Sequence, residues 1–319
     1  MDQILSFQSD HFELHTLAEG IFAAIAKDGG AAICDAGLID LGGQVVVFDT
    51  FMTPQAARDL CDFSSDTFGR PPQIVINSHY HNDHIWGNQI FASGAQILSS
   101  CHTRQLINTA GADEFQWYSA HSAERLEALQ AQFQNTQDEE EKRSLLLWIG
   151  YYQGLVEAFP HLRVCAPDIT FDCSLEIHGT HRSVRLITFE GAHTGSDTIL
   201  FLPQEGIIFM SDLLFVNCHP YLADGDPLGL LKVLKEISQL DATRFVPGHG
   251  PIGTREDVRL LIAYVEGCFD TAQKLVGTGI ANQEKFLELK VPLDFEAWQQ
   301  PQFYRNNIEF LWNSLHPAN

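Results

Sequence analysis

The sequence predicts an α/β (α+β) fold in which two strand-rich halves are separated by a long helical stretch. Short apolar runs typical of strands fill the first fifty residues and return after residue 167. Between residues 103 and 159 the apolar positions follow a helical pattern instead. Hydrophobic residues make up 45% of the chain and charged residues only 19%, which is the composition of a globular protein.

The first half is expected to contain a helix, a buried strand and then the helical stretch. A helix starts at Pro54, with Thr53 as its N-cap. The apolar run 74–76 predicts a buried strand. Within the helical stretch, the polar segment 135–142 is expected to form an exposed turn between two helices.

The second half is expected to return to strands and to end in helices. Apolar runs predict three strands, at 184–189, 198–202 and 206–210. Three later segments predict helices, at 227–240, 255–276 and 303–312.

A cluster of metal-ligand side chains follows the strand at 74–76. His79, His81, Asp83 and His84 place four such side chains within six positions. Alternation along an extended chain puts His79 and His81 on one face. Asp83 and His84 are adjacent in sequence and therefore diverge in a turn or helix, which suits ligands of two neighbouring ions. Imidazole and carboxylate groups are the usual protein donors to zinc.

Three further candidate ligands each follow an apolar strand. His193 comes just after the run 184–189, Asp212 closes the run 206–211, and His249 follows the short run 244–246. Loops beyond strand ends are where ligands collect in α/β proteins. We therefore expect all seven side chains to converge on one edge of the fold.

These motifs resemble the metallo-β-lactamase superfamily, and the resemblance covers most of the chain. It rests on five segments, which are the cluster at 79–84, the segment 191–194, the strand ending in Asp212, the loop 247–250 and the opening segment 41–50. The resemblance implies an αββα sandwich of two mixed β-sheets with outer helices. It makes residues 1–319 a single domain, with a helical insertion at 102–163 and a C-terminal helical extension at 281–319.

Carried over position by position, the resemblance implies a centre of two divalent metal ions. Zinc is expected, with iron or manganese as alternatives. His79, His81 and His193 would hold the first ion, Asp83, His84 and His249 the second, and Asp212 would bridge them. Ser211 departs from the pattern, because many members place glycine before the bridging aspartate.

The expected activity is that of a zinc-dependent hydrolase of a small ester, thioester or lactone. Two divalent ions lower the pKa of a bound water to about 7 and polarise the substrate oxygen. The expected nucleophile is a metal-bridging hydroxide, with Asp83 taking or relaying the proton and Asp212 completing the catalytic pair.

The loop after Asp212 supplies the candidate substrate contacts Cys218, His219 and Tyr221. β-Lactamase relatives often carry a lysine shortly after the bridging position, to hold the carboxylate of the drug. Here Phe215 occupies that stretch and no lysine precedes Lys232. A β-lactam hydrolase is therefore a less favoured alternative.

An iron-dependent oxidoreductase, resembling a persulfide dioxygenase, is the other alternative on the same fold. Iron accepts the same nitrogen and oxygen donors as zinc. A single-iron enzyme, however, has no need of Asp83, His84 and His249 as a second set. A scaffold that binds metal without catalysis is disfavoured by the complete ligand set.

Composition limits the partners. The net charge of −22 and the pI of about 4.8 disfavour nucleic acid as a partner. Seven cysteines without a Cys-x-x-Cys pair, and no visible secretory signal, predict a cytoplasmic location. No apolar span of membrane length occurs, so no membrane partner is expected. We expect a small-molecule substrate, and the helical insertion to serve as a lid, a pocket wall or a homodimer contact.

Overall fold

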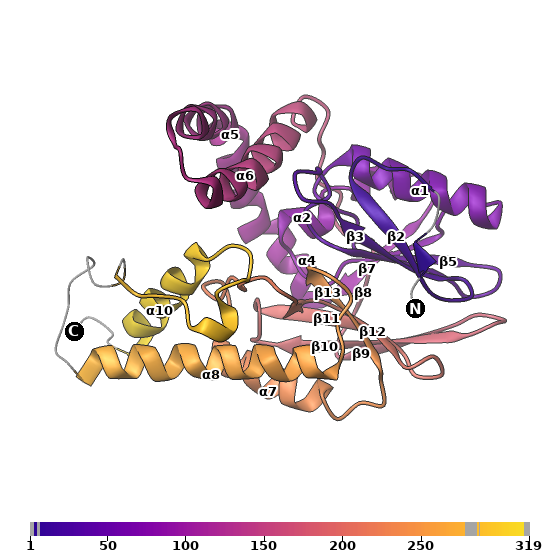
Figure 1. The fold of residues 1–319 in the computed structure, drawn as a ribbon. Coiled ribbons are helices and arrows are strands. Elements are labelled where there is room, and N and C mark those ends of the chain that lie inside the picture. The colour runs from indigo at the N-terminus through magenta and orange to yellow at the C-terminus, as the bar shows by residue number, and fades with distance from the viewer. Residues whose placement is uncertain (1–2, 5–6, 278–285, 287, 316–319) are drawn as a thin grey trace.

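The computed structural model describes residues 3–4, 7–277, 286 and 288–315. Its strands form an eight-stranded and a five-stranded sheet, with helices on the outer faces (Figure 1). Both sheets contain parallel and antiparallel pairs. This arrangement confirms the predicted αββα sandwich of two mixed sheets.

The first sheet runs in chain order from β1 to β8. Neighbours are antiparallel from β1 to β5 and parallel from β5 to β8. Its strands are β1 (Gln3–Ile4), β2 (Phe12–Ala18), β3 (Ile21–Ala26), β4 (Ala36–Asp40), β5 (Val45–Phe48), β6 (Ile74–Ile76), β7 (Gln96–Ser100) and β8 (Ile169–Phe171).

The second sheet has the order β13-β12-β11-β10-β9. All its neighbours are antiparallel except β12 and β13, which are parallel and change register between Phe209 and Phe215. Its strands are β9 (Ser174–His178), β10 (Ser183–Glu190), β11 (Ser196–Leu202), β12 (Ile207–Phe215) and β13 (Arg244–His249).

The helices cover the two sheets and form a hairpin beside them (Figure 1). Thr53 caps the first helix as predicted, its hydroxyl accepting from the Ala56 N–H. The helices are α1 (Pro54–Phe68), α2 (Asn82–Ile85), α3 (Asn88–Phe91), α4 (Cys101–Asn108), α5 (Ala110–Asn135), α6 (Glu139–Ala158), α7 (Pro227–Ile237), α8 (Arg255–Gly277), the 3-10 helix η1 (Leu293–Phe295) and α10 (Gln302–Leu315). None of the described helices is both long and apolar enough to cross a lipid bilayer.

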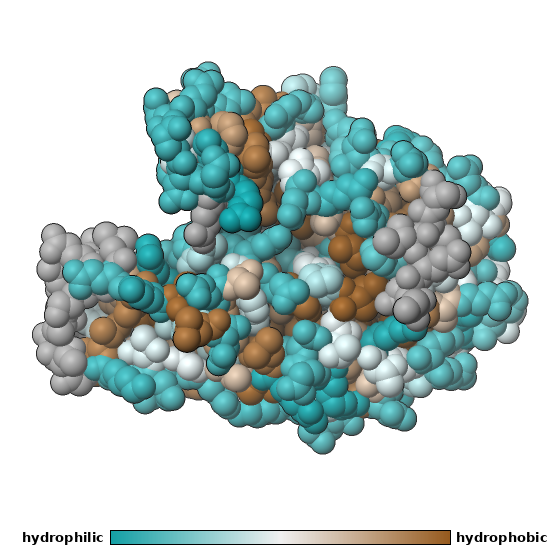
Figure 2. Space-filling view, viewed as in Figure 1, coloured by the Kyte–Doolittle hydropathy of each residue, from teal (hydrophilic) through white to brown (hydrophobic). Residues whose placement is uncertain are grey.

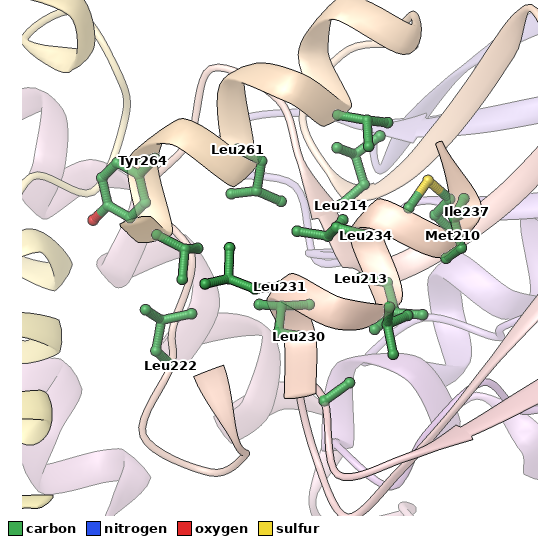
Figure 3. Close-up of a cluster of buried hydrophobic side chains, with 14 of the residues drawn as sticks. Met210, Leu213, Leu214, Leu222, Leu230, Leu231, Leu234, Ile237, Leu261 and Tyr264 are labelled. Atoms are coloured by element: carbon green, nitrogen blue, oxygen red, sulfur yellow. The ribbon is translucent and has the colours of Figure 1, made fainter. Parts of the chain in front are cut away.

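Side chains alternate between layers along the central strands. In β5, Val45 and Val47 pack in the cluster that contains α1, while Val46 and Phe48 pack between the sheets. In β12, Phe209 faces the other sheet, and Met210 belongs to the cluster beneath α7 and α8. Figure 3 shows part of this last cluster, with side chains of β12, α7 and α8 directed toward one another. Both strands are therefore buried on both faces, which fixes their ends in space.

The α5–α6 hairpin occupies the region for which we predicted a helical insertion. Leu155 and Tyr151 of α6 pack with Trp86 and Ile107 in a separate apolar cluster. The predicted turn at 135–142 is shorter than expected, because α6 already begins at Glu139. The boundaries 102–163 and 281–319 stay predictions, and residues 281–285, 287 and 316–319 lie outside the described part of the chain.

Candidate metal centre

The seven predicted ligands lie together where strands of both sheets end. His79 and His81 follow β6, and Asp83 and His84 lie on the short helix α2. The others come from the second sheet, with His193 in the β10–β11 turn, Asp212 within β12 and His249 at the end of β13. The structure therefore brings together side chains that are up to 170 positions apart in the sequence.

The donor atoms fall into two groups. The ligand atoms within each group lie within 4.8 Å of one another. The first group is His79, His81, His193 and Asp212, and the second is Asp83, His84 and His249. These groups could each hold a metal ion, and they match the division that the resemblance implied.

Asp212 faces both groups with different oxygens. Its Oδ2 lies 3.2 Å from Nε2 of His193 and 4.0 Å from Nε2 of His79. Its Oδ1 lies 3.2 Å from Nε2 of His84 and 3.3 Å from Nε2 of His249. One carboxylate is thus placed to serve two neighbouring cations.

The donor atoms have the pattern expected of ligands. Nε2 of His79, Nε2 of His84 and Oδ1 of Asp212 are buried and have no hydrogen-bond partner within the described part of the chain. A buried polar atom without a partner costs about 1–3 kcal/mol. These atoms are divided between the two groups, with His79 in the first and His84 and Oδ1 of Asp212 facing the second, which fits a pair of divalent ions. Imidazole with carboxylate is a donor set that zinc accepts.

The acids of the centre create a potential that favours cations. Burial favours the neutral ring of His249, but the Asp212 and Asp83 carboxylates together outweigh burial and raise the pKa of His249 to about 9. Burial also opposes the charge of Asp212, yet His249, His84 and His193 hold the pKa of this carboxyl well below its usual value. A divalent cation would meet the same attraction as these protons.

Asp49 supports His84 from behind the centre. The Asp49 side chain is fully buried, and its Oδ2 accepts from Nδ1 of His84 at 2.8 Å. The same carboxylate accepts from the Ser78 N–H at 2.8 Å and from the hydroxyl groups of Ser78 and Ser211 at 2.8 and 2.9 Å. With Nδ1 donating, Nε2 of His84 keeps its lone pair toward the second group.

Replacing Asp49 with asparagine is expected to weaken metal binding by roughly 10- to 100-fold, as for other residues that orient a ligand. The amide removes the negative charge that fixes the His84 ring. Competition with a chromophoric chelator measures the effect, and Asp62→Asn on the exposed face of α1 is the matched control. Wild-type affinity in Asp49→Asn would show that His84 needs no orienting partner.

Asp224 has the same relation to His81. Its Oδ2 lies 3.0 Å from Nε2 of His81, while Nδ1 of that ring lies 3.3 Å from Nε2 of His193. The hydrogen bond to His81 lowers the pKa of Asp224, so the carboxylate is ionised at neutral pH. Nδ1 of His81 is therefore the atom left to face the first group.

The sequence analysis assigned no role to Asp49 or Asp224. Asp49 did carry a signal, because it follows the apolar run of β5 just as ligands follow β6 and β13. Asp224 carried none, since it lies in the loop between β12 and α7, 143 positions from His81. Only the folded chain shows that pairing.

The contacts of Ser211 explain why serine stands where many members of the superfamily place glycine before the aspartate. Its φ of 50° lies in the left-handed region, where glycine is favoured. Its hydroxyl, however, contacts Asp49 Oδ2 at 2.9 Å and Ser78 Oγ at 2.8 Å. The side chain therefore joins the network that holds His84, which a glycine would not.

A large cavity borders the centre and contains all three candidate substrate contacts. Its volume is about 1010 Å³, and its lining includes Cys218, His219 and Tyr221. Cys218 and His219 are almost fully buried, whereas Tyr221 is partly exposed. Their contact with substrate stays a prediction, and Tyr221 presents the most surface for it.

His219 is packed against aromatic rings. Its Nδ1 lies 3.0 Å from the Tyr264 hydroxyl, and its ring centre lies 5.6 Å from that of Trp298. Burial lowers its pKa to about 4. The ring is therefore neutral at physiological pH and ties the β12–α7 loop to α8 and the C-terminal segment.

This burial predicts a pH dependence of stability. The unfolded chain protonates His219 near its ordinary pKa of 6.5, but the folded chain does so only near pH 4. Between these values the unfolded state binds the extra proton, so stability falls as pH falls, by at most about 1.4 kcal/mol per pH unit. Urea unfolding from pH 4 to 7 should give a shallower slope for His219→Gln than for wild type. The exposed His178→Gln is the control, and equal slopes in all three proteins would contradict the assignment.

Comparisons with known proteins agree with this architecture. Residues 29–249 match the metallo-beta-lactamase superfamily. No curated protein matches the chain. A metallo-beta-lactamase from Erythrobacter litoralis, solved with beta-mercaptoethanol in its active site, has a TM-score of 0.59 at 14% identity, covering 83% of this chain and 100% of its own.

Two further solved structures are similar. A metallo-beta-lactamase from Pseudomonas aeruginosa in its mono-zinc form has a TM-score of 0.57 at 15% identity, over 81% of this chain and 96% of its own. One from Pontibacter korlensis has a TM-score of 0.54 at 14% identity, over 83% and 99%. These identities establish a shared fold and nothing of the substrate. Because the family match spans more than half of the sequence and ends at the candidate ligand His249, the chain belongs to the metallo-beta-lactamase superfamily.

Proposed function

We propose that this chain is a binuclear, zinc-dependent hydrolase that cleaves a small ester, thioester or lactone. The observation that carries the proposal is the placement of Asp212, whose two oxygens face two groups of histidine and aspartate donors. The adjoining cavity of about 1010 Å³ is large enough for a small-molecule substrate.

The chemistry divides between the ions and the protein. Two divalent ions would supply Lewis acidity and a nucleophilic water at neutral pH. Asp212 fixes the separation of the two groups. Asp83 lines the cavity with a side chain that is 12% exposed, so we assign to its carboxylate the transfer of the proton from the attacking water to the leaving group.

Phe215 shapes the apolar side of the site. Its ring stacks on His249, with centres 5.3 Å apart and planes inclined by 14°, and it lies 5.7 Å from the His193 ring. An apolar ring in this position excludes water from one side of the ligands, which strengthens the electrostatic interactions inside the site.

The proposed hydrolysis adds one water across the acyl bond. An ester releases an acid and an alcohol, a thioester releases an acid and a thiol, and a lactone releases one hydroxy acid.

A β-lactam substrate is less well supported. The described residues that line the cavity include one basic side chain besides histidine, Lys27, and its Nζ donates to the Ser9 carbonyl at 2.6 Å. The carboxylate of a β-lactam would therefore meet one cationic side chain besides histidine, already bound to a backbone carbonyl, among six acidic lining residues. The solved relatives are named metallo-beta-lactamases, so a β-lactam belongs in the test.

The test is a hydrolysis assay on protein of measured metal content. The panel contains p-nitrophenyl acetate, an acetyl thioester, γ-butyrolactone, a chromogenic cephalosporin and bis-p-nitrophenyl phosphate. We expect turnover of at least one of the first three, lost on chelation and restored by zinc. Absence of turnover at two zinc ions per chain would overturn the proposal. One iron per chain with oxygen consumption would favour the oxidoreductase instead.

His84→Ala provides the internal control for this assay. The ring belongs to the second group alone, so its removal is expected to lower both the metal content and the rate. Undiminished hydrolysis in His84→Ala would assign the activity to a contaminant or to another site.

A further inference from the structure

Three aromatic rings from distant parts of the chain meet in the wall of the cavity. Trp148 comes from α6, Tyr221 from the β12–α7 loop and Phe303 from α10. The Phe303 ring centre lies 6.3 Å from that of Trp148 and 5.6 Å from that of Tyr221. All three side chains are partly exposed, so they present ring surface to the cavity. We call these three residues the aromatic wall.

Two carboxyl groups line the same cavity as the aromatic wall. The Asp224 carboxylate accepts from the Tyr80 hydroxyl at 3.4 Å, and, after burial, it is the charge that raises the pKa of Tyr221. Glu114 of α5 lines the cavity, and its Oε2 is buried without a hydrogen-bond partner in the described part of the chain. Burial, followed by the charges of Asp83 and Asp224, raises the pKa of Glu114 to about 8. Asp224 is therefore ionised beside His81, and Glu114 becomes ionised above its pKa.

The mouth of the cavity is also acidic. Glu13 and Asp28 are exposed among the lining residues. Gln299 Nε2 donates to Asp28, and Lys27 is held by the Ser9 carbonyl. The net charge of the whole chain, −22, is also negative. Anionic molecules are therefore repelled on approach, and cations are attracted.

Figure 2 shows where this cavity opens, in the hollow between the hairpin at the top and the C-terminal helices at the lower left. Its walls combine aromatic faces with the carboxyl groups of Glu114 and Asp224. Aromatic faces attract ammonium groups through the ring quadrupole, and carboxylates add charge complementarity. Neither feature recognises a carboxylate or a phosphate.

Resting on the proposed hydrolase function, we propose that the substrate carries a positively charged nitrogen. The ammonium group lies between the aromatic wall and the carboxyl groups of Glu114 and Asp224, and the scissile carbonyl lies at the metal centre. Water adds across the acyl C–O bond, which releases a carboxylic acid and an alcohol, and the ammonium group remains on its fragment unchanged.

Three esters of nearly equal shape test the proposal on the zinc-loaded chain. They are butyrylcholine, its neutral carbon isostere 3,3-dimethylbutyl butyrate, and the anionic ester 3-butyryloxypropanoate. Each kcat/KM is divided by the rate of alkaline hydrolysis of the same ester. We expect the cation to exceed the neutral ester by about tenfold, as one well-placed ammonium–aromatic contact supports, and the anion to be slowest.

Three variants test which residues cause the preference for the cationic ester. At pH 9, above the pKa of about 8 of Glu114, Glu114→Gln keeps the shape and an accepting oxygen but removes the charge, so the preference for the cation over the neutral ester is expected to fall at that pH. Phe303→Leu should lower it as well, since leucine offers no ring face. Glu124→Gln changes an exposed residue of the same helix outside the cavity lining and should leave the preference intact.

A binding measurement separates this inference from the hydrolase proposal. Benzyltrimethylammonium is titrated into the zinc-loaded protein, and the fluorescence of the lining residues Trp148 and Trp298 reports binding. Binding at pH 9 that weakens in Glu114→Gln supports the inference even if no ester is hydrolysed, and only the hydrolase proposal then fails. Preferred hydrolysis of the neutral or anionic ester, or absence of probe binding, overturns the inference and leaves the hydrolase proposal standing wherever turnover is seen.

Discussion

Replacing Asp212 with alanine is expected to reduce metal content to at most one ion per chain and to lower kcat/KM by at least about 10³-fold. The large effect follows from geometry, because Oδ2 faces His193 and Oδ1 faces His84. No other described side chain of the centre contributes an atom to both sides. Metal analysis by mass spectrometry and kinetics on the best substrate of the panel measure the two changes.

Two companions make this result specific to the carboxylate. Asp212→Asn keeps the size of the side chain and should resemble Asp212→Ala if charge is what matters. Asp241→Ala, on the exposed link before β13, should retain both ions and full activity. Survival of turnover and metal content together in Asp212→Ala would refute the shared centre.

Gly248→Ala is expected to disrupt the centre although it substitutes none of the candidate ligands. A Cβ on Gly248 would lie 1.8 Å from Oδ1 of Asp212 and 2.8 Å from its backbone nitrogen. Because β12 and β13 are paired there and buried, the strands cannot separate freely. We expect a loss of about 1–3 kcal/mol in the free energy of unfolding, as for other overpacked sites, together with loss of metal.

Gly267→Ala is the matched control for this substitution. Gly267 lies in the middle of α8, and a Cβ there would meet no atom within 4 Å apart from its chain neighbours and the adjacent helix backbone. Alanine in a helix interior is favoured over glycine by roughly 0.5–1 kcal/mol, so this variant should be slightly stabilised. Denaturant unfolding and metal analysis compare the two variants. Two tightly bound ions and wild-type stability in Gly248→Ala would show that Asp212 tolerates displacement.

The fold class and the grouping of the donors could be predicted because both have local signals. Buried strands such as β6 and β12 are short apolar runs, and donors placed directly after such runs come together at one edge. The cluster from His79 to His84 holds four donors of its own. The family match over residues 29–249 confirms the resemblance on which the fold prediction rested.

Other features lacked a local signal. Strand β9 (Ser174–His178) was not predicted, because its residues are exposed or half-exposed throughout and form no buried apolar face. The turn predicted at 135–142 was too long, because charged residues are also common on the exposed face of a helix. Lys142 and Glu139, one turn apart in α6, form an ion pair at 2.8 Å.

The polar partners of the ligands depend on contacts between distant segments. Asp49 reaches His84 across 35 positions, and Asp224 reaches His81 across 143. Glu114 comes from the hairpin, where the sequence shows only a helical pattern. Such pairings are set by how the sheets and helices pack, so no spacing rule along the chain predicts them.

The hairpin of α5 and α6 contributes Glu114 and Trp148 to the cavity, whereas all seven donors come from outside it. One part of the cavity wall and the candidate metal ligands are therefore encoded by separate stretches of the gene. Grafting a different hairpin onto the same sandwich would change this part of the cavity wall while the seven candidate ligands stayed in place, which makes the hairpin a natural segment to exchange when the cavity is redesigned.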